Sequence, residues 1–208
     1  MNWQFPIDDA KLPLPLDESG LIGKGTRRYC YHFPDMPRLC IKIPKVNRHG
    51  KVQQRREVKY YQSLSRRGVP TNLITNYHGS LQTSLGKGYV YDAVRDADGS
   101  ISRSLAKYTE SDPARYPEYI KVLDAIENYL FDHLVIVYDL NAYNILCRQN
   151  DQGNLEPFII DGVGDIVAIP VLNLSKNLVR QKIRRRWLRF INRMTQKHDW
   201  MSEYSFIH

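Results

Sequence analysis

The sequence predicts an α+β protein, with a β-rich first half and a mainly helical second half. Up to residue 96, short apolar runs alternate with turns that contain glycine or proline, which is typical of antiparallel strands. After residue 97, apolar residues recur at the spacing of helical turns. The 208 residues are 42% hydrophobic and 25% charged, which is an ordinary composition for a globular chain that buries a core.

The first half predicts an N-terminal arm, five strands and one helix. The arm is expected at residues 1–20, which contain three prolines. The strands are expected within residues 20–43, 73–82 and 88–94. Residues 51–64 mix apolar residues with Gln, Arg and Glu, which predicts an amphipathic helix. We therefore expect residues 21–96 to form an antiparallel five-stranded lobe with one helix.

Residues 97–208 predict a small, mainly helical lobe. Apolar residues at helical spacing indicate one helix at residues 117–133 and a last helix at about residues 175–195. The apolar face of the last helix contains Val179, Ile183, Trp187, Phe190, Ile191 and Met194. Its other face is basic and contains Lys182, Arg185, Arg186, Arg189 and Arg193.

The positive charge of the chain is concentrated near this last helix. The net charge is +8, but residues 170–198 contain nine Lys or Arg and no acid, which leaves 8 − 9 = −1 for the rest. The helix is expected either to expose its basic face to water or to bind an anionic surface. A membrane surface ranks above nucleic acid, because no aromatic stacking platform accompanies the arginines.

No segment predicts a membrane crossing or a secretory signal. The longest apolar runs fall far short of the roughly 18 residues that span a bilayer, and the N-terminus has acids where a signal peptide is basic. We expect a cytoplasmic protein, with peripheral contact at the inner membrane face through the basic helix. Cys30, Cys40 and Cys147 lack the spacing of a disulfide framework or a zinc site and are expected to be small core residues.

Three polar side chains of the second half follow apolar runs. Asp139 and Asn144 lie in a polar loop after residues 134–137, which predict a buried strand. Asp161 directly follows another apolar run. A carboxylate can accept a proton from an attacking hydroxyl, and amide and carboxylate oxygens suit Mg²⁺. Asp139 is thus a candidate base and Asn144 and Asp161 are candidate metal ligands, with Asp165 ranked lower. Ordinary Asp- and Asn-rich turns are the alternative interpretation.

The first half contains a lysine in an apolar strand. Lys42 is the one charge in residues 39–44, and a buried ammonium requires an anionic partner. Glu57, in the predicted helix, is a candidate partner, while an exposed lysine and a solvated glutamate are the alternative. A glycine-rich turn precedes this strand and contains Gly23, Lys24 and Gly25. Taken alone, such a turn is a weak signal for phosphate binding.

In this order, the motifs resemble those of the protein-kinase-like superfamily, and roughly residues 20–190 look most like the bacterial YrbL family of PhoP-regulatory-network proteins. The resemblance implies a two-lobed fold that binds ATP between its lobes. It implies a phosphate loop at Gly23, Lys24 and Gly25. It also implies that Lys42 holds phosphates and that Glu57 orients Lys42. Asp139 matches the catalytic-loop aspartate, and Asn144 and Asp161 match the magnesium ligands.

Several positions depart from the kinase pattern. Arg28 replaces the third glycine of the phosphate loop, Asn141 replaces a lysine of the catalytic loop, and Gly162 replaces the phenylalanine after the metal-binding aspartate. Val137-Tyr138 stands where the pattern has His-Arg. Only 47 residues follow Asp161, too few for a full activation segment and a helical substrate platform. Phosphorylation of peptides in trans is therefore not expected, whereas ATP binding is less affected.

The leading interpretation is an ATP- and Mg²⁺-dependent phosphotransferase, whose acceptor the motifs do not identify. The chief alternative is a pseudokinase-type regulatory module that binds ATP without efficient turnover. A third interpretation is an adaptor that binds a membrane surface or nucleic acid through the basic helix.

Overall fold

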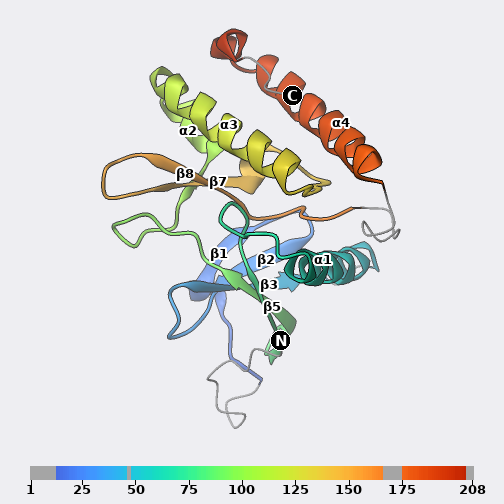
Figure 1. Cartoon of the computed structure of the whole chain (residues 1–208). Coiled ribbons are helices and arrows are strands. Elements are labelled where there is room, and N and C mark those ends of the chain that lie inside the picture. The colour runs from blue at the N-terminus through green and yellow to red at the C-terminus, as the bar shows by residue number, and fades with distance from the viewer. Residues whose placement is uncertain (1–12, 46–47, 166–174, 205–208) are drawn as a thin grey trace. The chain divides into compact units, whose positions relative to one another are not determined.

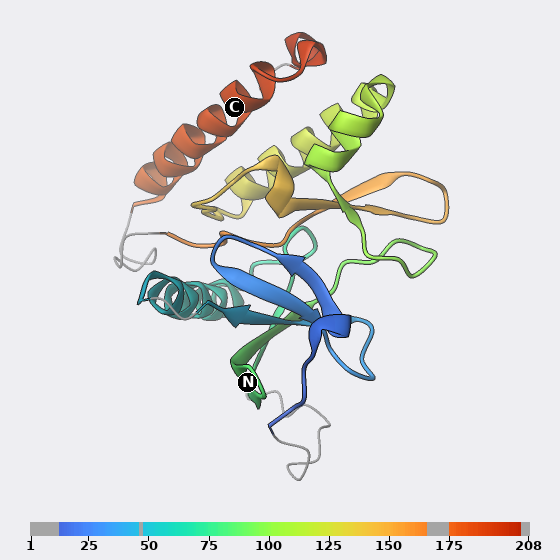
Figure 2. The same cartoon turned by 180° about the vertical axis from the view of Figure 1, so that it is seen from behind.

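The computed structural model describes residues 13–45, 48–165 and 175–204, and the chain divides into two compact units (Figures 1 and 2). The first unit comprises residues 1–58 and 75–93, and the second comprises residues 59–74 and 94–208. Residues 59–74, which the sequence assigns to the first lobe, thus belong to the second unit. Among the described residues, the structure is a mixture of helices and antiparallel strands, so the predicted α+β class is confirmed.

The first unit contains the predicted five-stranded antiparallel sheet. Its strands follow the order β1-β2-β3-β5-β4, and they are β1 (Leu21–Lys24), β2 (Arg28–His32), β3 (Leu39–Pro44), β4 (Tyr77–Thr83) and β5 (Gly86–Asp92). The central strand β3 buries Ile41 and Ile43 in a core that also receives Val90 from β5. Leu14, from the predicted arm, lies in the same core and pairs with the end of β4 through its backbone. The arm is therefore part of this unit from Leu14 onward.

A long helix, α1 (Arg48–Arg66), follows β3, where the sequence predicts a helix at residues 51–64. The helix ends where Gly68 adopts a φ of +65°, a left-handed conformation that glycine adopts without strain. Residues 48–58 of the helix belong to the first unit and the remainder to the second.

The second unit combines helices with a small sheet. It contains α2 (Leu105–Ser111), α3 (Tyr116–Asp132), α4 (Lys176–Thr195) and the strands β6 (Arg103–Ser104), β7 (Ile145–Gln149) and β8 (Leu155–Ile159), in the order β6-β7-β8. Helix α3 packs against β8, and α4 runs beside α3 in both views (Figures 1 and 2). In the described chain, the strand expected at residues 134–137 is reduced to a bridge, in which Val137 pairs with Val163 and Gly164.

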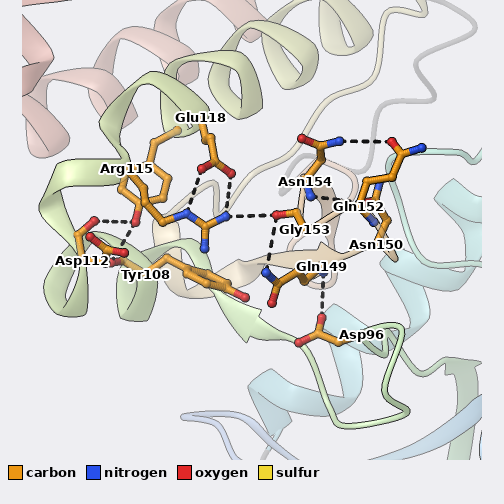
Figure 3. A network of polar contacts seen from close by, with 11 residues as sticks. Asp96, Tyr108, Asp112, Arg115, Glu118, Gln149, Asn150, Gln152, Gly153 and Asn154 are labelled. Atoms are coloured by element: carbon orange, nitrogen blue, oxygen red, sulfur yellow. Dashed lines mark hydrogen bonds and ion pairs between the residues drawn. The ribbon is translucent and has the colours of Figure 1, made fainter.

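The hairpin of β7 and β8 is fixed at its tip by a network of polar contacts (Figure 3). The guanidinium of Arg115 donates to both carboxylate oxygens of Glu118, at 2.8 and 2.6 Å, and to the carbonyl of Gly153, at 3.1 Å. The carboxylate of Asp96 accepts from the backbone N–H of Gln149 at 2.8 Å. These contacts stabilise the register of the hairpin, whose other end leads into the polar loop and to Asp161.

Helix α4 has the bounds and the buried face that the sequence predicts. The side chain of Ser175 accepts a hydrogen bond from the backbone of Leu178 and caps its N-terminus. The six apolar residues predicted for its inner face are all buried. Among the described residues, no helix has the length and apolarity needed to cross a bilayer.

Two of the three cysteines are buried core residues, as the sequence predicts. Cys40 and Cys147 are buried, Cys30 is partly buried, and none forms a disulfide bond. Burial, with a smaller contribution from Asp96, raises the pKa of the Cys147 thiol to about 12. A thiol with such a pKa is protonated at neutral pH, so Cys147 is not a candidate nucleophile.

Candidate functional site

The polar loop of the second unit is held by its own amide side chains. Asn141 Oδ1 accepts hydrogen bonds from the backbone N–H groups of Tyr143 and Asn144, at 3.0 and 3.1 Å, and caps a short 3₁₀ turn. Its amide nitrogen donates to a carboxylate oxygen of Asp139 at 3.2 Å. Asn144 Nδ2 donates to the carbonyl oxygen of Asp139 at 3.0 Å. The candidate base and the candidate metal ligand are therefore parts of one ordered loop.

The hairpin register brings Asp161 to this loop. Strand β7 begins directly after Asn144, and its first residue, Ile145, pairs with Ile159 near the end of β8. The next residue, Ile160, donates its backbone N–H to the carbonyl of Asn144 at 2.9 Å. Asn144 and Asp161 thus lie at the same end of the hairpin, although 17 positions separate them along the chain.

Gly162 closes the arrangement by lying against the backbone of Asp139. A β-carbon at Gly162 would lie 2.9 Å from the Asp139 Cβ and 3.0 Å from its backbone nitrogen, and the φ of Gly162 is +74°. The backbone N–H of Tyr138 donates to the Gly162 carbonyl at 2.8 Å. The second unit therefore brings together Asp139, Asn144 and Asp161, and glycine is needed at position 162 because any side chain there would collide with Asp139.

Asn144 and Asp161 are the residues of this region that could hold a magnesium ion. Asn144 uses its Nδ2 to donate to the Asp139 carbonyl, and the oxygen of an amide side chain is a group that can bind a hard cation. The described residues contain no group of three or more His, Cys, Asp or Glu side chains arranged around a metal position. Protein Mg²⁺ sites commonly use one or two side chains and complete their shell with water and phosphate oxygens. Asn144 and Asp161 would supply the protein oxygens of such a site.

Lys42 lies in a buried polar cluster of the first unit. Its ammonium is 4.4 Å from the centre of the Tyr91 ring, and the side chain is almost fully buried. The Tyr91 hydroxyl donates to Glu57 Oε1 at 2.9 Å and accepts from Gln54 at 2.8 Å. Lys42 and Glu57, which the sequence predicts to act together, are thus both buried here and are linked through Tyr91.

The ion pair that the structure gives Glu57 is with Arg28. The guanidinium donates to both carboxylate oxygens, at 3.2 and 2.8 Å, and Arg28 also contacts Gln54 Oε1 at 3.1 Å. Sequence reasoning treated Arg28 only as the residue that replaces a glycine, and it overlooked Tyr91. The register contained a usable signal: Cys30 lies opposite Lys42, so Arg28, two residues earlier on β2, faces the same side of the sheet.

The glycine-rich turn joins β1 to β2 in the same unit. Gly23 and Lys24 lie at the end of β1, and the Gly25 N–H donates to the Arg28 carbonyl at 2.9 Å. Lys24 is exposed. The turn therefore has exposed positive charge and an open backbone at Gly23, where a β-carbon would meet no atom within 4 Å.

Helix α4 contacts both chain segments of the second-unit site. Asp165 accepts hydrogen bonds from Lys182 and Arg186, each at 2.7 Å. Arg193 donates to the carbonyl of Leu140, next to Asp139. Asp165, the lower-ranked candidate ligand, is therefore engaged by two cations. Lys182 and Arg186, expected on an outer basic face, instead turn toward the protein.

The comparisons with known proteins identify the family of this chain. The family model described as PhoP regulatory network protein YrbL matches residues 14–195. The chain is 36% identical over 181 residues to a protein named YrbL from Escherichia coli (strain K12) and equally to one from Shigella flexneri, and each match covers 85% of both sequences. The chain therefore belongs to the YrbL family, and this part of the resemblance seen in the sequence is confirmed.

Gly162→Ala is expected to destabilise the chain more than Gly99→Ala. Both glycines have positive φ, +74° and +85°, so each substitution introduces backbone strain of about 1–2 kcal/mol. Only the β-carbon at position 162 also meets other atoms closely, which adds a penalty of about 1–3 kcal/mol. Urea denaturation followed by circular dichroism measures both. Equal losses for the two variants would contradict the close contact with Asp139.

Asp165→Asn is expected to lower the free energy of unfolding by about 2–3 kcal/mol at neutral pH, a value reduced because Lys182 and Arg186 are partly exposed. Burial alone would raise the pKa of Asp165, but the hydrogen bonds from Lys182 and Arg186 outweigh it, so the pKa is lowered. A lowered pKa stabilises the fold above the unfolded-state value of about 3.9, and this contribution disappears as the pH falls through the folded-state pKa.

Chemical denaturation of the parent and of Asp165→Asn over a series of acidic pH values measures this difference. Glu156→Gln is the matched control, because Glu156 pairs with Arg148 at the surface, where both side chains are about 40% exposed. Its loss is expected to stay below about 1 kcal/mol. A difference between parent and Asp165→Asn that stays constant down to the most acidic pH would contradict the assignment.

Proposed function

We propose that this protein is a magnesium- and ATP-dependent phosphotransferase of protein-kinase-like fold. The observation that carries the proposal is the meeting of Asp139, Asn144 and Asp161 in one unit, each at the end of a hydrogen-bonded element. A carboxylate able to act as a base, beside an amide and a second carboxylate, is the set of groups that phosphoryl transfer requires. The order of the elements along the chain also supports a protein-kinase-like phosphotransferase. A β-sheet with a buried lysine comes first, followed by a helix with a glutamate, a loop aspartate and a hairpin aspartate.

Each residue has a defined task in this proposal. Asp139 accepts the proton of the attacking hydroxyl, while Asn141 holds its carboxylate at 3.2 Å. Asn144 and Asp161 bind magnesium, which neutralises charge on the phosphates when it is bound. Lys42 binds phosphate oxygens, and its ammonium is positioned by the face of the Tyr91 ring.

Glu57 acts on Lys42 through Tyr91 in this proposal. Because Arg28 pairs with both oxygens of Glu57, that carboxylate is already neutralised. Glu57 also fixes Tyr91, whose ring positions the ammonium of Lys42. The glycine-rich turn at Gly23, Lys24 and Gly25 adds the exposed ammonium of Lys24 as a phosphate contact, and the absence of a side chain at Gly23 leaves room for a phosphate to approach.

A pseudokinase-type regulatory module is the second candidate, and a specific observation favours it. Asn141 occupies the catalytic-loop position that holds a lysine in protein kinases, and its amide is used to cap the 3₁₀ turn. The loop therefore lacks a cation that stabilises charge at the transferred phosphoryl group. This candidate binds Mg-ATP with the same residues but has no task for Asp139 as a base.

Mg-ATP is expected to raise the melting temperature of the parent by roughly 5–10 °C at a hundredfold excess over its Kd, because a ligand specific for the folded state stabilises it. Lys42→Ala and Asp161→Asn should lose most of this shift. Differential scanning fluorimetry with Mg-ATP and with ATP plus EDTA measures the effect. Lys45→Ala and Asp151→Asn are matched controls, since Lys45 also lies over a tyrosine ring, at 4.9 Å, and Asp151 is exposed in the hairpin turn. The absence of any shift in the parent would reject nucleotide binding.

Asp139→Asn distinguishes an active phosphotransferase from the regulatory module. In an active enzyme, this isosteric change is expected to lower Mg-ATP turnover about 10²–10⁴-fold while leaving the melting shift in place, because only proton transfer is lost. Release of inorganic phosphate with water as the acceptor gives the rate without a known acceptor. Turnover that is unchanged in Asp139→Asn, with Mg-ATP still bound, would support the regulatory module instead.

A further inference from the structure

Helix α4 has an outer face whose charges are not used within the protein. Six basic residues on this helix are exposed, and five of them are considered as its outer face: Lys176, Arg180, Arg184, Arg185 and Arg189, the sixth being Arg193. Among the described residues, none of these five has a hydrogen bond, an ion pair or a ring contact, in contrast to Lys182, Arg186 and Arg193. The helix contains no acidic residue that would neutralise them. The outer face therefore presents a continuous positive charge to its surroundings.

Two leucines interrupt this charged face. Leu178 is 49% exposed and Leu188 is 37% exposed, and they are among the few large apolar side chains exposed in the described chain. Leu178, Arg185 and Arg189 follow the i, i+7, i+11 spacing that returns to one side of a helix, and Leu188 adjoins this row. The face thus combines guanidinium groups with protruding aliphatic side chains.

The aromatic residues of α4 point the other way. Trp187 and Phe190 are each 1% exposed and pack against each other in the core of the second unit, with ring centres 5.5 Å apart and ring planes tilted by 58°. They cannot serve as a platform for nucleic-acid bases, which requires exposed rings. The apolar face as a whole is equally buried, so the helix cannot insert that face into lipid. What remains for contact is the outer face of arginines and leucines.

We propose that the outer face of α4 binds the surface of an anionic phospholipid bilayer. The guanidinium groups match lipid phosphates in charge and geometry, and the two leucines reach the boundary of the acyl chains. Binding is electrostatic and reversible, since the main apolar face of the helix stays packed on α3 and its neighbours (Figure 2). This inference rests on α4 alone and is independent of the proposed phosphotransferase activity.

Sedimentation with vesicles of phosphatidylglycerol mixed with phosphatidylcholine tests the proposal, with pure phosphatidylcholine vesicles as the lipid control. The full chain is expected to bind the anionic vesicles, and binding should weaken as salt is added. The triple variant Arg184→Gln, Arg185→Gln, Arg189→Gln is expected to bind on the order of 100-fold more weakly. In the described chain these side chains are exposed and make no hydrogen bond, ion pair or ring contact, so the variant is expected to retain its fold, which circular dichroism checks.

A charge-matched control removes three exposed cations from other helices. The variant Arg55→Gln, Lys59→Gln, Lys121→Gln has the same net charge as the α4 triple variant and should lose less than about threefold in binding. Equal losses in the two triple variants would overturn the proposal, because only overall charge would then matter. Equal binding of the parent and the α4 variant would overturn it as well.

Substitution of the two exposed leucines distinguishes a lipid partner from a nucleic-acid partner. Leu178→Ser with Leu188→Ser is expected to weaken vesicle binding about tenfold, because apolar contact with the bilayer is lost. Fluorescence anisotropy with a short DNA duplex provides the second arm. Binding to the duplex that is unaffected by the leucine changes, together with no binding to anionic vesicles, would show a nucleic-acid surface and overturn the lipid assignment.

Discussion

The contact between Gly162 and the backbone of Asp139 is the constraint on which the second-unit site depends. This contact requires glycine at position 162, because φ is positive there and a side chain would collide with Asp139. The contact holds the segment after β8 against the start of the polar loop. The register of the β7–β8 hairpin is the second constraint, because Ile145 pairs with Ile159 and so places Asn144 and Asp161 at one end of the hairpin. Local turn chemistry alone would leave these groups as separate surface turns. Their convergence comes from long-range backbone pairing, so any change that shifts the hairpin by one residue would separate them.

Helix α4 divides its charge between two tasks according to the direction of each side chain. Lys182 and Arg186 neutralise the buried Asp165, and Arg193 holds the carbonyl of Leu140, so this side of the helix stabilises both segments of the site. The arginines of the outer face lie one to three positions away in sequence and have no such contacts among the described residues. A partner that binds the outer face therefore contacts the same rigid helix that supports the Asp139 loop. In this fold, a bound surface and the candidate site are linked through one helix and three side-chain contacts.

Much of the fold follows from local sequence patterns. Alternating apolar runs and turns predict the five strands of the first unit, and the apolar row from Val179 to Met194 predicts the buried face of α4 without error. The polar loop is also recognisable, because Asp139, Asn144 and Asp161 follow apolar runs. The partners of the charged side chains are harder to predict from the sequence. The pairing of Arg28 with Glu57 depends on which face of β2 meets α1, and that of Asp165 on how α4 packs, and neither can be derived from spacing along the chain. The predicted strand at residues 134–137 is wrong. This apolar run is buried, but in the described chain it pairs as a bridge at Val137 and not as a full strand.

The cluster around Glu57 shows how two buried cations are accommodated within the first unit. Arg28 is a second cation on the side of the sheet that Lys42 faces, which like-charge repulsion would disfavour. Glu57 offsets that repulsion by pairing with Arg28, and Gln54 and Tyr91 complete the hydrogen bonding of the carboxylate and guanidinium. Because both charges of the Arg28–Glu57 pair are buried and hydrogen-bonded, removing either alone would leave the other uncompensated. Arg28 and Glu57 are therefore expected to vary together, as a structural unit that keeps Tyr91 against Lys42.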